Sequence, residues 1–152
     1  MIDHDLSERI AVSLRFSGDE LNPDEVSTVI GSQPTRAYRK GDPRTSPNGT
    51  CLGLARFGLW SLSISQDQPG DLEAKIVALL GATTQDLSRW HVLTGRFRAE
   101  LFCGVFMPGM NWGINLSPAI QAAIGQRGLE LDLDIYAADV DDSLPPQDQG
   151  LA

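Results

Sequence analysis

Two short segments of the sequence carry the same helix-start signal, and each lies between stretches of alternating apolar residues. Residues 21–31 begin Leu-Asn-Pro and end Ile-Gly, and residues 116–125 begin Leu-Ser-Pro and also end Ile-Gly. Asparagine and serine are favoured N-cap residues, proline is favoured at the first helical position, and glycine commonly follows a helix. The sequence therefore predicts one helix that begins at Pro23 and another that begins at Pro118.

Four segments have the period-two alternation of apolar residues that is typical of half-buried β-strands. These segments are residues 9–16, 57–64, 97–106 and 129–136. In the last of them, leucine and isoleucine alternate with acidic residues, so the apolar side chains are expected to face inward. Asp71 and Thr84 are candidate N-caps of two further helices between the second and third strands.

The order of these elements predicts a fold. Two strand–helix–strand units with an insertion between them give an α+β domain with the ferredoxin-like order, a two-layer sandwich on a four-stranded antiparallel sheet. The first strand would lie between the third and the fourth, and the extra helices would fall between strands two and three. We expect a single domain over residues 1–138, with a basic loop at 32–56 and an acidic flexible tail at 139–152.

The charge balance disfavours several classes of partner. With 20 acidic and 12 basic residues, the chain has a formal net charge of -8, which repels nucleic acid and anionic membrane surfaces. The first residues lack the pattern of a secretory signal, and no segment approaches the roughly 18 apolar residues of a membrane-spanning helix. We therefore expect a cytoplasmic protein in which Cys51 and Cys103 are unpaired.

Sequence signals of catalysis are absent. The chain has no nucleophile elbow, phosphate-binding loop, dinucleotide fingerprint or Cys-x-x-Cys pair. His4 and His91 are its two histidines, and an isolated histidine is more often structural than catalytic. Acidic side chains between residues 130 and 141 have oxygens that could ligate a hard cation, but a solvated acidic strand edge is the commoner reason for such a pattern. No catalytic residue, metal site or cofactor is predicted, and whether the chain carries out any reaction stays open.

The basic loop is a candidate anion site. Its candidate ligand-binding residues are Arg36, Tyr38, Arg39, Lys40 and Arg44. Arginine forks bind carboxylate or phosphate in bidentate fashion, and a tyrosine ring can stack on a ligand. Trp112, in the Met107–Trp112 loop, would form the other wall of this site. The alternative is that the cations pair with nearby acids, namely Asp19, Glu20, Asp42 and the acids of the fourth strand.

The sheet face opposite the helices gives the leading functional hypothesis. Leu59, Phe102 and Phe106 are expected on that face, and exposed apolar side chains suit a partner surface. The chain would then be a non-catalytic protein-interaction module that binds another protein or itself. The alternative function is a small anionic-ligand-binding protein or enzyme that uses the site between the two loops.

Several motifs resemble the bacterial family catalogued as domain of unknown function 4279. They lie at residues 13–23, 30–31, 34–42, 58–62, 116–118 and 131–136. The resemblance spans roughly residues 10–137 and implies a bacterial cytosolic domain. It implies no activity, so no catalytic residue can be transferred to this chain.

Overall fold

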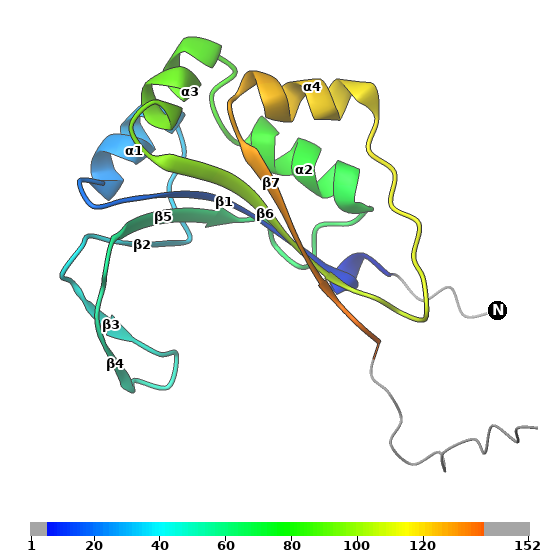
Figure 1. Ribbon diagram of the computed structural model, residues 1–152, viewed down its shortest axis with the longest axis horizontal. Helices are drawn as coiled ribbons and strands as arrows, with labels where there is room; N and C mark the ends of the chain where they lie inside the picture. Colours follow the sequence, from blue (N-terminus) through cyan, green and yellow to red (C-terminus); the bar gives the residue numbers. More distant parts are fainter. Residues whose placement is uncertain (1–5, 139–152) are drawn as a thin grey trace, which may run out of the picture.

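The computed structural model of the chain describes residues 6–138, so the predicted tail at 139–152 and His4 lie outside the described residues. The main sheet has five strands, and the four α-helices lie on one side of it (Figure 1). In spatial order its strands are β2 (Arg36–Tyr38), β5 (Gly58–Ser63), β1 (Ile10–Gly18), β6 (Arg98–Phe106) and β7 (Glu130–Tyr136). The other elements are η1 (Leu6–Arg9), α1 (Pro23–Ile30), α2 (Leu72–Gly81), α3 (Leu87–Thr94), α4 (Pro118–Gln126) and a separate hairpin of β3 (Pro43–Thr45) and β4 (Cys51–Leu54). We call the side with the helices the covered face and the other side the open face.

The predicted four-stranded antiparallel, ferredoxin-like sheet is wrong, because the observed sheet is five-stranded and mixed. β7 pairs with β6 in parallel, while every other neighbouring pair in the main sheet is antiparallel. β1 lies between β5 and β6, so both of its edges are occupied and β7 adds to the outside of β6. β2 lies within the predicted basic loop and was not predicted as a strand. Three residues are too few to show an alternating pattern.

The helix-start signals are confirmed. α1 begins at Pro23 and α4 at Pro118, and in both the side chain of the preceding residue accepts a backbone N–H of the first turn. Gly31 ends α1 with a φ of 77°, a left-handed conformation that glycine adopts without steric cost. α3 is capped by Asp86 instead of Thr84. The longest helix has ten residues, and within residues 6–138 none could cross a membrane.

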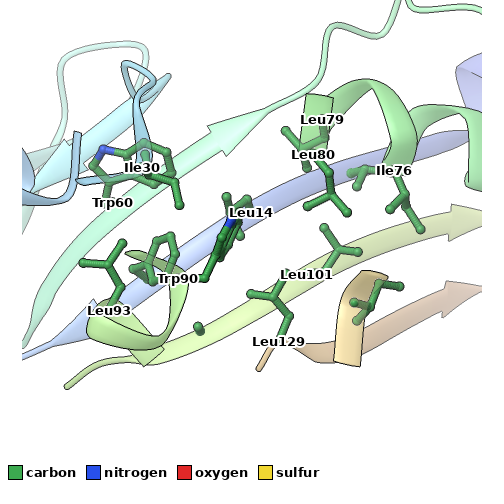
Figure 2. Close-up of a cluster of buried hydrophobic side chains, with 14 of the residues drawn as sticks. Leu14, Ile30, Trp60, Ile76, Leu79, Leu80, Trp90, Leu93, Leu101 and Leu129 are labelled. Carbon is green, nitrogen blue, oxygen red and sulfur yellow. The ribbon is translucent and has the colours of Figure 1, made fainter. Parts of the chain in front are cut away.

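A core rich in aromatic side chains lies between the covered face and the helices (Figure 2). Leu14, Phe16, Trp60 and Trp90 are all fully buried, and the Phe16 ring centre lies 5.8 Å from that of Trp60 and 6.0 Å from that of Trp90. The Trp60 indole Nε1 donates a hydrogen bond of 2.9 Å to the Ser27 hydroxyl, which satisfies its one buried donor. Because successive side chains of a strand point to opposite faces, burial of these residues against the helices places their neighbours in each strand on the open face.

The covered face is incompletely shielded at the β7 edge. Leu131, Leu133 and Ile135 lie on that face, in register with buried residues of β6. Their relative exposures are nevertheless 39%, 44% and 54%. The predicted inward direction is therefore right, but the helices stop short of covering the last strand.

Candidate functional site

A hollow of about 340 Å³ lies on the open face across β1, β2, β5 and β6, and we call it the open-face hollow. Its charged lining residues are Arg15, Arg36, Arg98 and Glu100. Four serine hydroxyls and the rings of Tyr38 and Phe57 complete much of the wall. The lining therefore combines three cations with one carboxylate, in a chain whose net charge is -8.

Strand register places the charged residues in one row across the sheet. In spatial order the row is Arg36, Ser61, Arg15, Glu100 and Glu130, one residue from each of the five strands. Because paired residues in neighbouring strands point to the same side, all five belong to the open face. The row is basic at the β2 edge and acidic at the β7 edge, so the open face is electrically polarised.

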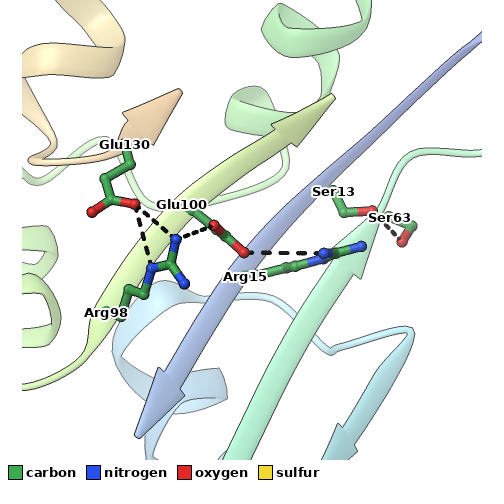
Figure 3. A network of polar contacts seen from close by, with 6 residues as sticks. All are labelled: Ser13, Arg15, Ser63, Arg98, Glu100 and Glu130. Carbon is green, nitrogen blue, oxygen red and sulfur yellow. Dashed lines mark hydrogen bonds and ion pairs between the residues drawn. The ribbon is translucent and has the colours of Figure 1, made fainter. Parts of the chain in front are cut away.

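The charges on the β6 and β7 side neutralise one another (Figure 3). Glu100 lies between two guanidinium groups, with oxygen-to-nitrogen distances of 3.2 Å to Arg98 and 4.0 Å to Arg15. Arg98 also donates to Glu130 at 3.2 Å, and this hydrogen bond, followed by the charges of Glu100 and Glu130, raises the pKa of Arg98. Little unpaired positive charge is left on this side of the hollow.

The β2 side is different, because its cations have no matching carboxylates. The guanidinium carbons of Arg36 and Arg44 lie 5.5 and 5.3 Å from the centre of the Tyr38 ring, a cation–π arrangement. Neither guanidinium forms an ion pair with another described residue, and the buried Arg44 Nε has no hydrogen-bond partner there. Both arginines line a neighbouring hollow of about 560 Å³, together with residues of the β3–β4 hairpin, and Arg36 also lines the open-face hollow.

The other two cations of the predicted loop site have structural partners. Lys40 forms an ion pair of 3.1 Å with Asp19. The Arg39 guanidinium donates to the Asn22 side chain at 2.9 Å, beside the N-terminus of α1. Arg39 and Lys40 therefore contact residues near the start of α1, whereas Arg36 and Arg44 lie beside Tyr38. The predicted pairing with acids applies to only part of the basic loop.

Trp112 lies away from the basic loop. It is partly buried, packs against the core and lines a separate hollow of about 130 Å³ with Ile10 and Leu72. These neighbours belong to the covered side of the sheet. The structure therefore does not bring the Met107–Trp112 loop and the basic loop into one site.

The three interface candidates lie on the open face but are not equally accessible. Leu59 lines the open-face hollow, and the Arg15 guanidinium lies 4.0 Å above the Phe102 ring. Phe106 is 45% exposed and stacks on Tyr136, with ring centres 4.6 Å apart. Of the three, Phe106 is the one that offers an uncovered aromatic surface.

The family model named domain of unknown function (DUF4279) matches residues 8–138, which include every strand of the main sheet. The chain belongs to the DUF4279 family. The match confirms the resemblance seen in the sequence, and the family's description names no reaction. No curated protein and no solved structure matches the chain.

In this DUF4279 chain, sequence reasoning missed the charged residues at the centre of the open face. Arg15, Arg98 and Glu100 were visible only as the polar members of alternating strands. The same period-two pattern that buries Leu14 and Leu101 turns their neighbours to the open face. Charge at successive alternate positions was the signal that could have identified them.

The histidine and acidic residues considered for acid–base or metal chemistry do not form one cluster among the described residues. Within residues 6–138, no three histidine, cysteine or acidic side chains converge as a metal site requires. Asp139 and Asp141, the other acids considered for a cation, lie outside that range. His91 is exposed, and its Nε2 lies 2.8 Å from the Gln126 carbonyl oxygen, a contact that links α3 to the end of α4.

Proposed function

We propose that this chain binds a small anionic ligand at the β2 side of the open face. The observation that carries the proposal is the pair of arginines, Arg36 and Arg44, that flank Tyr38 without a carboxylate partner among residues 6–138. Two nearby guanidinium groups repel each other, and a bound anion would remove that repulsion. The planar guanidinium group of arginine binds a carboxylate or a phosphate through two parallel hydrogen bonds, so two neighbouring arginines suit an anionic ligand.

The dimensions and chemistry of the open-face hollow indicate the ligand class. A volume of about 340 Å³ is at the small end of the range for pockets that hold small molecules, about 300–1,000 Å³. Arginine forks supply paired donors for a carboxylate or a phosphate, and serine hydroxyls supply neutral hydrogen bonds. A nucleic acid is a poor candidate, because the net charge of -8 repels an extended phosphate backbone.

Calorimetric titration with inorganic phosphate, pyrophosphate and citrate tests this function. We expect the wild-type chain to bind at least one of these anions. Arg36→Gln and Arg44→Gln should each weaken binding about tenfold, because a hydrogen bond to a charged group contributes about 1.5–3 kcal/mol. Lys40→Gln is the matched control: it removes the same charge from the same loop, but Lys40 pairs with Asp19.

Two outcomes would count against anion binding at this site. One is that none of the three anions binds to the wild-type chain. The other is that Lys40→Gln weakens binding as much as Arg36→Gln does, since that result would indicate a general effect of net charge.

A second candidate function is binding of another protein, at the opposite edge of the sheet. It is favoured by the exposed aromatic pair of Phe106 and Tyr136 on the open face, and by the exposed apolar residues Leu131, Leu133 and Ile135 on the other side of the same edge strand. Both faces of this edge therefore expose apolar side chains of the kind found at binding surfaces. The two candidate functions use different edges of the sheet and can be tested separately.

A further inference from the structure

We propose that the outer edge of β7 takes up, as a sixth strand, an extended segment of a partner protein in which basic and apolar residues alternate. β7 is the last strand of the main sheet and pairs only with β6 among the described strands. Half of its backbone N–H and C=O groups therefore point away from the sheet, as in domains that bind peptides by strand addition. The proposal rests on the protein-binding candidate and is independent of the anion site.

Of the usual features that protect a sheet edge, β7 has acidic side chains, which repel another acidic strand but not a basic one. Natural edge strands are often very short or carry lysine, proline or a bulge, each of which hinders pairing with another chain. β7 has seven residues, contains neither lysine nor proline, and keeps an unbroken register with β6 from Glu130 to Tyr136. At the other edge of the sheet, β2 has only three residues. The β7 edge is therefore the longer and more regular template.

On the side of the sheet that carries the helices, the apolar side chains of β7 remain exposed to solvent. Leu131, Leu133 and Ile135 are 39–54% exposed, although the residues beside them in β6 are buried. An added strand would place its own alternate side chains directly next to these three. Apolar residues at those positions would bury the exposed surface, which gives a favourable hydrophobic contribution.

On the open side, the same strand presents carboxylates. Glu130 is paired with Arg98, and Asp134 accepts a hydrogen bond from the Tyr136 hydroxyl. Asp132 lies between them and forms no hydrogen bond or ion pair with another described residue. Opposite charges on directly paired strands are stabilising, so the open-side positions of the added strand should carry lysine or arginine.

A second copy of this chain does not fit the edge. Two β7 strands that pair with their leucine faces together must also bring their acidic faces together, because side chains alternate with a period of two. In an antiparallel pair centred on Leu133, Asp132 of one copy would face Asp134 of the other. Like charges at directly opposed positions are destabilising. The charge pattern therefore selects a basic partner over self-association.

Nuclear magnetic resonance of the labelled full chain, with defined peptides as probes, tests strand addition. The probe is a blocked heptapeptide in which lysine and valine alternate, and its control has glutamate in place of lysine. We expect the lysine peptide to slow hydrogen exchange at the alternate β7 amides that point outward, and the glutamate peptide to have no such effect. Protection of these amides is specific to backbone pairing, unlike a general electrostatic association.

Variants separate a local from a global effect of charge. The double variant Asp132→Asn with Asp134→Asn should weaken binding of the lysine peptide about fivefold. The matched control, Glu20→Gln with Asp67→Asn, removes the same charge from exposed sites distant in the fold and should change the affinity little. Arg36→Gln, which tests the anion site, should leave peptide binding intact.

Several results would overturn the proposal. Unchanged exchange at β7 would exclude pairing there, and so would equal affinity for the glutamate peptide or an equal loss in the control variant. Peptide-induced shifts confined to Phe106 and its surroundings would leave the protein-binding candidate standing but refute strand addition. Sedimentation of the free chain as a dimer that Leu133→Asp dissociates would identify a second copy as the occupant.

Discussion

The two faces of the main sheet are made from the same strands, yet they differ in almost every physical property. On β1, Leu14 and Phe16 have no exposed surface and pack beneath the helices, while Arg15 between them is half-buried and contacts Glu100 across the open face. Alternation along one strand thus places residues that stabilise the fold next to residues that can contact a ligand. The contrast predicts that substitutions on the covered face change stability, and that those on the open face chiefly change binding.

The largest expected effect contrasts two adjacent residues of β5. Trp60→Ala should lower the free energy of unfolding by about 3–5 kcal/mol, because it opens a cavity among fully buried rings and leaves the Ser27 hydroxyl without its partner. Leu59→Ala, on the open face, should cost about 1 kcal/mol, since this side chain is only half-buried. Urea denaturation of both variants measures the difference. Similar losses from the two would mean that the open face also carries core packing.

The cysteines give a second contrast, between the covered face and the β3–β4 hairpin. Burial, with a smaller contribution from the charge of Asp132, raises the pKa of Cys103 from 9.0 to about 12. Cys51 is exposed, and both thiols are free. At pH 8 we expect a disulfide reagent to modify Cys51 in the native chain and Cys103 only after unfolding.

The raised pKa of Cys103 also predicts a pH dependence of stability. Above pH 9 the unfolded thiol loses its proton while the folded thiol keeps it until about pH 12, so the folded state binds more protons and stability falls as pH rises through this window. By pH 10 the loss should be about 1 kcal/mol. Cys103→Ala should flatten this part of the pH profile, whereas Cys51→Ser should not. Equal profiles in the two variants would show that Cys103 does not set the dependence.

Local signals in the sequence predicted the elements of the fold better than their arrangement. The caps before Pro23 and Pro118 are chemical features of a few neighbouring residues, and both helices begin where these features place them. The position of β7 depends instead on which sheet edges remain free after β5 and β6 have paired with β1. No local pattern encodes that competition, so the predicted antiparallel order was wrong. β2 was missed for a related reason, because its pairing with β5 defines it more than its own three residues do.

The candidate site was predicted in part, and its omissions have the same physical origin. Arg36, Tyr38 and Arg44 stood out as a local cluster of charge and aromatic character, and the structure brings them together. Trp112 was predicted to lie in the same site, but in the fold it lines a separate hollow. Residues such as Glu100 join the hollow only through strand register, which becomes readable once the strand order is known.

The smallest expected effect concerns Glu100, the one carboxylate that lines the open-face hollow. Glu100→Gln should reduce stability by no more than about 1 kcal/mol, because Arg98 keeps its partner Glu130 and Arg15 keeps its contact with the Phe102 ring. The same change removes the negative charge that opposes an anion in the hollow. Phosphate should therefore bind about threefold more tightly, a shift set by the change in Coulomb energy at a partly solvated site.

Glu130→Gln provides the matched control for that experiment. It removes a carboxylate from the same network, but Glu130 does not line the hollow and is largely exposed. Glu130→Gln should therefore change phosphate affinity less than Glu100→Gln does, even if the two variants have similar free energies of unfolding. Phosphate binding that stays the same or weakens in Glu100→Gln would mean that the anion is held elsewhere, since an anion bound to Arg36 in the open-face hollow must respond to the charge of Glu100 in the same hollow.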